Sequence, residues 1–138
     1  MGGAVRFSVS LEPELLRAFD AWVQREGVAT RSEAIKQLMR AALVEREWAD
    51  GATVAGALVL VYDHHRRDLV QRLMDIQHDF GPTVISTQHV HLDHDNCLEV
   101  VTVRGEAGVI RRLRHAVNAV KGLKHSSLVM ATTGTAIA

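Results

Sequence analysis

The chain has 138 residues, of which 47% are hydrophobic, and its sixteen Lys and Arg balance sixteen Asp and Glu. This length and composition exclude wholesale disorder and fit one ordinary domain or two small ones. Zero net charge argues against nonspecific coating of nucleic acid or anionic membranes, and no apolar run approaches the ~20 residues of a membrane span. A single cysteine cannot form an intramolecular disulfide, so we expect a cytoplasmic protein with no membrane partner.

The histidines divide the chain into two parts. All eight lie after residue 60, and the first fifty residues contain none. This shift in composition predicts a boundary near Asp50. We therefore expect two domains, over residues 1–49 and 50–138.

The first domain is expected to contain one strand and two helices. Val5, Phe7 and Val9 alternate with polar residues, which predicts a half-exposed strand over residues 5–10. Pro13 suits the first turn of a helix that ends at Gly27.

The second helix of this domain has a start signal of its own. Thr30 and Glu33 have the spacing of a capping box, so this helix is expected to begin at Arg31 and to run to about Trp48.

The second domain alternates strands and helices. Runs of branched apolar residues and helical apolar spacing predict strands and helices in the order β-α-β-β-α-β. The strands are expected at residues 53–62, 83–92, 97–104 and 123–132, with helices at 66–80 and 106–121. This is the order of a ferredoxin-like fold, so the whole chain is predicted to be α+β.

A lone strand of residues 5–10 has no partner for its backbone polar groups, and so small a domain buries little surface alone. A dimer in which two copies of the strand pair would solve both problems. Arg6, Ser8 and Ser10 would then face outward on a two-stranded ribbon. A ribbon of this kind fits the major groove of B-DNA, where Arg can hold guanine and Ser can bind any base.

The start of the second helix adds a second possible contact with DNA. There, Arg31 and Ser32 would offer backbone N–H groups to a phosphate. The alternative is that the three outward residues of the strand, Arg6, Ser8 and Ser10, form only a solvated face.

With these features, the first domain resembles the ribbon-helix-helix repressors. The resemblance rests on the strand-helix-helix layout and on the run Arg31-Ser32-Glu33-Ala34-Ile35. It implies a symmetric dimer that reads a pseudo-palindromic operator through Arg6, Ser8 and Ser10.

A cluster of metal-binding residue types lies in the second domain. His89 and His91 are two residues apart on a predicted strand, so they share one face, and Cys97 begins the next strand. If His91 pairs with Cys97, Glu99 lies opposite His89, and two imidazoles and a thiolate share a face with a carboxylate beside them. A register shifted by one residue would turn Cys97 to the other face and abolish the site.

A closed metal site usually has four ligands, and His78 at the end of a helix is the expected fourth, from the same or another subunit. Imidazole and thiolate suit zinc, copper or nickel, and ligand identity alone does not choose among them. Glu99 would hold an imidazole N–H. His94 is interpreted as solvated. The remaining histidines are interpreted as surface residues that could form a weak secondary site: His64, His65, His115 and His125.

Both domains together resemble the nickel-responsive transcriptional regulators, the NikR family, over roughly residues 5–130. The resemblance is carried by the segment Gln88-His89-Val90-His91-Leu92-Asp93-His94-Asp95-Asn96-Cys97-Leu98-Glu99 and by Tyr62-Asp63-His64 and Arg67-Asp68-Leu69. It implies an ACT-like second domain that forms the core of a homotetramer, a dimer of dimers.

For the metal, the resemblance implies one Ni(II) per subunit in a planar site of His89, His91 and Cys97 with His78 of a neighbouring subunit. Nickel would raise affinity for double-stranded operator DNA and repress nickel uptake. The family can also hold a cation near Glu33, but Gln37 stands where an acidic residue would help.

Two other classes of function remain as alternatives. The second domain could sense a small molecule of the amino-acid type, with the histidine cluster incidental. The cluster could instead be a catalytic metal centre, but four protein ligands in a planar site leave no open position for substrate. We therefore expect a regulator rather than an enzyme.

Overall fold

The computed structural model describes residues 2–138 and divides into two compact units, which are described separately below. The first unit ends at Met39, and the second comprises Arg40–Ala138. The predicted domain boundary at residue 49/50 stays a prediction. Among the described residues, no helix combines the length and the apolar character needed to cross a bilayer.

Both helices predicted for the first domain are present: the first lies wholly in the first unit, and the second begins there and continues into the second unit. Helix α1 spans Pro13–Glu26, and Gly27 follows it in the left-handed conformation, with φ of 70°. A glycine adopts this conformation without the steric cost that a Cβ would bring. Helix α2 spans Arg31–Ala49. The Glu33 N–H donates to Thr30 Oγ1 at 3.1 Å, which is half of the expected capping box.

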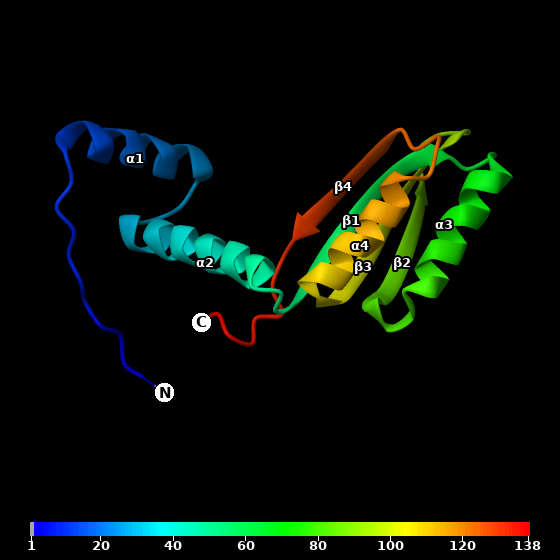
Figure 1. Cartoon of the computed structure of the whole chain (residues 1–138). Coiled ribbons are helices and arrows are strands. Elements are labelled where there is room, and N and C mark those ends of the chain that lie inside the picture. The colour runs from blue at the N-terminus through cyan, green and yellow to red at the C-terminus, as the bar shows by residue number, and fades with distance from the viewer. Residues whose placement is uncertain (1) are drawn as a thin grey trace. The chain divides into compact units, whose positions relative to one another are not determined.

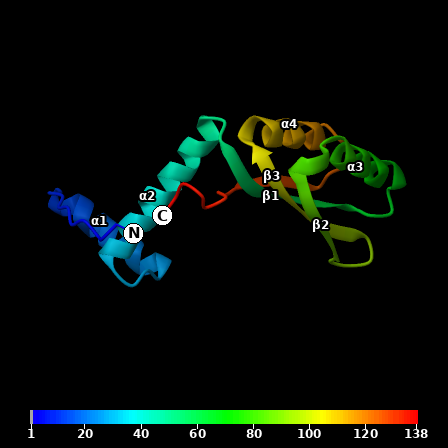
Figure 2. The same ribbon diagram turned by 90° about the horizontal axis from the view of Figure 1, so that it is seen from below.

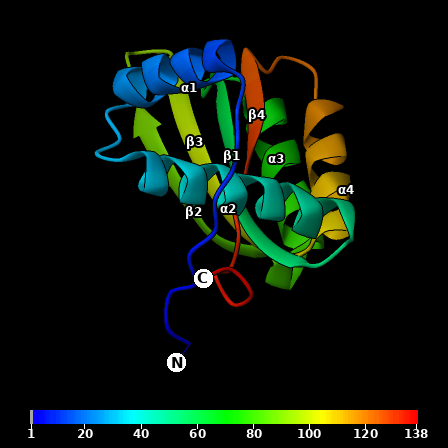
Figure 3. The same ribbon diagram turned by 90° about the vertical axis from the view of Figure 1, so that its left-hand side faces the viewer.

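The predicted strand over residues 5–10 is not formed in the structure. These residues belong to no strand; they line a groove together with residues of α1 and α2, and Figure 3 shows the segment crossing α2. The physical reason is that a strand is defined by hydrogen bonds to a neighbouring strand, and the neighbour predicted for this segment belongs to a second copy of the chain.

The second unit has the predicted β-α-β-β-α-β order. Its elements are β1 (Thr53–Asp63), α3 (Arg67–Asp79), the short 3-10 helix η1 (Gly81–Thr83), β2 (Val84–His91), β3 (Asn96–Glu106), α4 (Ala107–Asn118) and β4 (His125–Met130). The sheet is antiparallel with the order β2-β3-β1-β4. Helices α3 and α4 lie side by side over one face of it (Figures 1 and 2).

The core of this unit lies between the sheet and the two helices. Along β1, alternate residues from Val54 to Tyr62 are buried, as are alternate residues of β3 from Cys97 to Val103. Trp48, near the end of α2, is also buried in this core, and its indole N–H donates to the Ala131 carbonyl at 2.8 Å. Aliphatic side chains therefore dominate the packing, in keeping with the low aromatic content.

Candidate metal centre and DNA interface

The register of the β2–β3 hairpin decides whether the predicted metal ligands share a face. His91 pairs with Cys97, and His89 pairs with Glu99. Directly opposed residues of an antiparallel pair project to the same side of the sheet. The register is therefore the one that the metal site requires, and the alternative shifted by one residue is excluded.

A bulge at the far end of the hairpin accompanies this register. Val84 pairs with Val103, whereas Ser86 pairs with Thr102, so Ile85 is an extra residue on β2. An extra residue of this kind absorbs a one-residue mismatch between the two ends of a strand pair. The bulge lies at the end of the strand pair away from the turn, so one continuous register runs from Ser86 to His91 and aligns His91 with Cys97.

Two of the four predicted ligands are already close together in the single chain. His89 Nδ1 lies 3.8 Å from Cys97 Sγ, and Cys97 is only 1% exposed. The ring of His91 instead stacks on the ring of His64, with centroids 4.6 Å apart. His78 lies exposed in the last turn of α3. Within the described chain, these four residues do not supply three ligand atoms within 4.8 Å of one another.

Glu99 is the buried carboxylate beside these ligands. It is 2% exposed, and its Oε1 lies 3.2 Å from His89 Nδ1. Tyr62 donates its hydroxyl to Oε1 at 2.8 Å, and Gln77 donates its amide to Oε2 at 2.7 Å. Burial, followed by the hydrogen bond to Glu99, raises the pKa of Tyr62. Glu99 therefore lies where it was expected to hold the imidazole, and both of its oxygens have donors.

The turn between the two strands is closed by Asp93. Its Oδ1 accepts the backbone N–H groups of Asp95 at 2.9 Å and Asn96 at 2.8 Å, and the Asn96 amide also donates to it. These hydrogen bonds, that of the Asn96 side chain first, lower the pKa of Asp93 to about 2. The turn is thus held by a carboxylate that stays ionised in mild acid.

The donor set fits a borderline transition metal. An imidazole nitrogen and a buried cysteine sulfur face each other on one hairpin, and such ligands suit nickel, zinc or copper. The buried carboxylate supplies the outer support that metal-binding histidines usually have.

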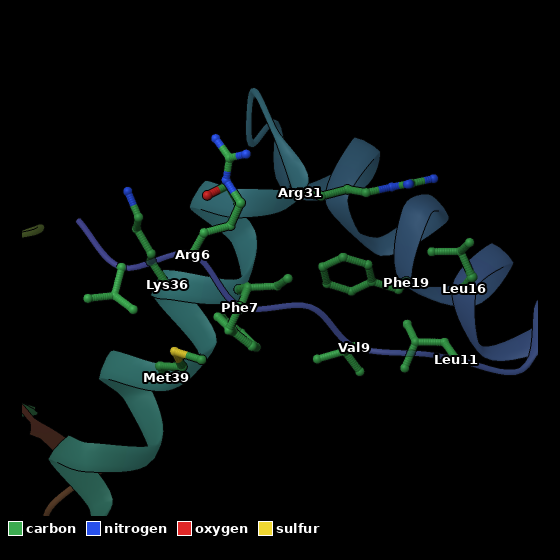
Figure 4. Close-up of a pocket in the computed structure, with 12 residues that line it drawn as sticks. Arg6, Phe7, Val9, Leu11, Leu16, Phe19, Arg31, Lys36 and Met39 are labelled. Carbon is green, nitrogen blue, oxygen red and sulfur yellow. The ribbon is translucent and has the colours of Figure 1, made fainter.

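The predicted DNA-contacting residues of the first unit are exposed. Arg6, Ser8 and Ser10 lie on the segment before α1, and the alternating Val5, Phe7 and Val9 are 90%, 59% and 61% exposed. In Figure 4, Arg6 points away from Met39, whereas Phe7 lies toward it. The segment therefore has one polar side and one apolar side.

The apolar side of this segment borders a groove of about 730 Å³ within the first unit (Figure 4). Apolar side chains from the segment, α1 and α2 provide most of its lining, among them Val5, Phe7, Val9, Leu11, Leu16, Phe19, Ile35 and Met39. A groove of this kind leaves apolar surface that a second copy of the segment could cover.

Arg31 and Glu33, at the start of α2, are both engaged by other side chains. Arg31 donates from Nε and one terminal nitrogen to the two carboxylate oxygens of Asp20, each at 2.8 Å. The same hydrogen bonds lower the pKa of Asp20. Glu33 accepts from Lys36 Nζ at 3.0 Å, and Ser32 is exposed.

Two family descriptions match this chain. That of the NikR C-terminal nickel-binding domain matches residues 55–131, and that of ribbon-helix-helix proteins of the CopG family matches residues 5–46. Curated relatives named as nickel-responsive regulators are 48% identical in Syntrophus aciditrophicus, over 97% of this chain and 98% of the relative, and 49% identical in Chlorobaculum tepidum, over 96% and 98%. The chain belongs to the NikR family of nickel-responsive regulators.

A solved structure supports the fold alone. An uncharacterised protein from Thermotoga maritima is 12% identical, with a TM-score of 0.51, over 56% of this chain and 95% of that protein.

Sequence reasoning missed several contacts in this NikR-family chain. Tyr62 and Gln77 hold Glu99, and Asp20 holds Arg31. The signal for Tyr62 was present, because a tyrosine within an otherwise apolar strand needs a partner for its hydroxyl. Gln77 and Asp20 gave no such signal, since polar residues on amphipathic helices are usually solvated.

Proposed function

We propose that this protein is a nickel-dependent transcriptional repressor that binds a pseudo-palindromic operator and controls nickel uptake. One Ni(II) per subunit would be held by His89, His91 and Cys97 with His78 of a neighbouring subunit. The observation that carries this proposal is the approach of His89 Nδ1 to the buried Cys97 Sγ, at 3.8 Å in the register that aligns His91 with Cys97.

Because the proposed fourth ligand comes from another subunit, bound nickel would also hold two subunits together. His78 is exposed at the end of α3, where a neighbouring subunit can reach it. A metal that joins His78 to another hairpin would link two subunits of a cytoplasmic homotetramer. When bound, nickel would supply a rigid connection between side chains that the single chain leaves apart.

DNA recognition is proposed to depend on a dimer of the first unit. Two copies of residues 5–10 would pair as an antiparallel ribbon, cover the apolar groove and present Arg6, Ser8 and Ser10 to base edges. At the start of α2, the backbone N–H groups at Arg31 and Ser32 would bind phosphate. The Arg31 side chain is held by Asp20, so its backbone rather than its guanidinium is the proposed contact. Glu33 could act as a cation ligand only if its hydrogen bond from Lys36 were broken.

Repression would follow from thermodynamic linkage. If nickel stabilises the arrangement of subunits that binds the operator, operator binding must stabilise nickel by the same factor. A coupling free energy of about 1–3 kcal/mol changes operator affinity roughly 5–150-fold. Membership of a regulator family supports this role over an enzymatic one and over a sensor of amino-acid-type ligands.

The test compares operator binding with and without nickel in wild type and in Cys97→Ala. We expect the variant to keep its circular dichroism spectrum and to lose the nickel-dependent gain in affinity, because the thiolate ligand is missing. An intact nickel response in the folded variant would overturn the assignment of Cys97.

The matched control is Arg6→Ala, which changes the other unit. It is expected to bind nickel as wild type does and to lose operator recognition. Unchanged operator affinity in Arg6→Ala would remove the ribbon from the proposal and leave the metal site standing.

A further inference from the structure

Helix α2 belongs to both units of the chain. It is continuous from Arg31 to Ala49, and the boundary between the two units falls within it, between Met39 and Arg40. Its first turn carries the proposed phosphate contact, and its later turns lie in the unit that holds the proposed nickel ligands. The residues that attach the end of α2 to the second unit are therefore placed to affect how one unit responds to the other.

Trp48 anchors the end of α2 in the second unit. Its side chain is only 1% exposed and packs in the core of that unit, together with Val44 one turn earlier. Gly56 on β1 makes room for the ring, because a Cβ at this position would come within 3.4 Å of the indole and 2.6 Å of the Val129 carbonyl oxygen. An indole packed so closely leaves the end of the helix little freedom to move.

Arg111 on α4 holds Trp48 from a second side. A terminal nitrogen of its guanidinium donates to the Trp48 carbonyl oxygen at 3.0 Å, and its Cζ lies 5.8 Å from the centre of the indole ring. This carbonyl is one of the last four of α2, which have no partners within the helix. A charged donor makes a strong hydrogen bond, and a cation near an indole face is attracted to it. Arg111 therefore ties α2 to α4 through both the backbone and the ring.

The segment after β4 holds α2 at two further points. The Trp48 indole N–H donates to the Ala131 carbonyl at 2.8 Å, and the Ala131 N–H donates to the Ala55 carbonyl of β1 at 2.9 Å. About two turns earlier on α2, Arg40 Nε donates to the Ala138 carbonyl oxygen at 2.7 Å. The segment thus returns from the sheet to α2 (Figures 1 and 2). Together, the contacts of Trp48 with Arg111 and Ala131 form the Trp48 clamp.

We propose that Trp48 and Arg111 are positioning residues, which couple nickel binding to DNA binding by fixing the end of α2 on the nickel-binding unit. A change in the second unit alters the start of α2 only if the end of the helix moves with that unit. Once the Trp48 clamp is released, the end of the helix moves independently, and the change is lost before it reaches the DNA contact. The attachment of α2 stands on its own contacts, whereas the coupling rests on the proposed function.

The test compares Arg111→Ala with Arg112→Ala. Both residues are exposed cations on α4, so the two variants remove the same charge, whereas the hydrogen bond to Trp48 comes from Arg111. Operator affinity is measured with and without nickel, and nickel affinity is followed through the absorption band of the nickel-bound thiolate. In Arg111→Ala, the gain in operator affinity that nickel produces should fall at least about 2-fold, with nickel affinity unchanged. Arg112→Ala should keep the wild-type gain. Equal gains in the two variants would overturn the coupling role.

Hydrogen exchange tests the attachment of α2 in the absence of nickel and DNA. The backbone N–H groups of Asp50 and Ala52 donate to carbonyls in the last turn of α2, at 2.9 and 3.0 Å, so they report on the end of this helix. They should exchange at least about 5-fold faster in Arg111→Ala than in Arg112→Ala. The Leu92 N–H, which donates within the hairpin turn, should exchange equally in both, which separates local release from global unfolding. Equal exchange at the end of α2 would show that Arg111 does not hold it.

Two further variants probe the chemistry of the Trp48 clamp. Trp48→Phe keeps an aromatic ring in the core and removes the N–H that donates to Ala131. It should reduce the nickel-dependent gain as Arg111→Ala does, whereas Arg111→Lys, which keeps a cation, should restore part of the gain. A full gain in Trp48→Phe would remove the Ala131 contact from the proposal. If wild type itself shows no nickel-dependent gain, the proposed function fails, and the exchange rates still decide whether Arg111 holds α2.

Discussion

Tyr62 is one of two side chains that donate a hydrogen bond to Glu99, the buried carboxylate of the proposed metal site. Its hydroxyl donates to Glu99 Oε1 at 2.8 Å, and both residues are almost fully buried. Tyr62→Phe removes the donor and leaves the burial of Glu99 unchanged. A buried acceptor left without its donor costs about 1–3 kcal/mol. We therefore expect the free energy of unfolding to fall by about that amount and the urea midpoint to move to a lower concentration. Thr87→Val, which removes an exposed donor to Gln77, should cost less. Equal midpoints for wild type and Tyr62→Phe would contradict this reading of the network.

The hairpin turn is the element that sets the register of the proposed metal ligands, and Asp93 is the residue that closes the turn. Its pKa is lowered to about 2, chiefly by the Asn96 side chain. A carboxylate with a lowered folded pKa stabilises the turn fully above its unfolded pKa of about 3.9 and loses this effect as pH falls through about 2. We therefore expect the backbone N–H of Asn96 to stay protected from hydrogen exchange at pH 4 in wild type and to exchange faster in Asp93→Ala. Loss of protection in wild type already at pH 4 would argue against this account.

The start of α2 is the second element whose side chains bear on function. Asp20 holds Arg31 in a bidentate pair whose side chains are 42% and 59% exposed. Asp20→Ala frees the Arg31 guanidinium beside the proposed phosphate contact. Each added phosphate contact steepens the plot of log binding constant against log salt concentration by about 0.9, so we expect a steeper slope in this variant. Asp50→Ala, which releases Arg46 at the other end of α2, is the matched control and should leave the slope unchanged. Identical slopes in the two variants would place Arg31 away from the DNA.

At the scale of the whole molecule, local patterns were sufficient to predict most of the fold. Alternating and helical apolar spacing gave the six elements of the second unit in their observed order, and Gly27 and Thr30 marked helix ends correctly. Helix α4 ends at Asn118, earlier than the predicted residue 121, because apolar spacing continues through Val120 into the following turn. Periodicity describes which face is buried and does not locate where helical hydrogen bonds stop.

The candidate metal site could be predicted only up to a choice of register. Histidine spacing placed His89 and His91 on one face, but the side on which Cys97 lies depends on the register set at the hairpin turn, which spacing alone left open. The Glu99 network and the Trp48 clamp join residues distant in sequence, so they follow from the tertiary fold rather than from spacing.

The last prediction concerns the two units acting together. Linkage requires that operator DNA tighten nickel binding by the factor by which nickel tightens operator binding, roughly 5–150-fold. In wild type, a nickel titration with saturating operator should therefore give a lower dissociation constant than one without DNA. Arg6→Ala should match wild type without DNA and lose the DNA-dependent gain, because its metal ligands are intact and its DNA contact is not. A DNA-dependent gain that persists in Arg6→Ala would mean that the coupling does not pass through the ribbon.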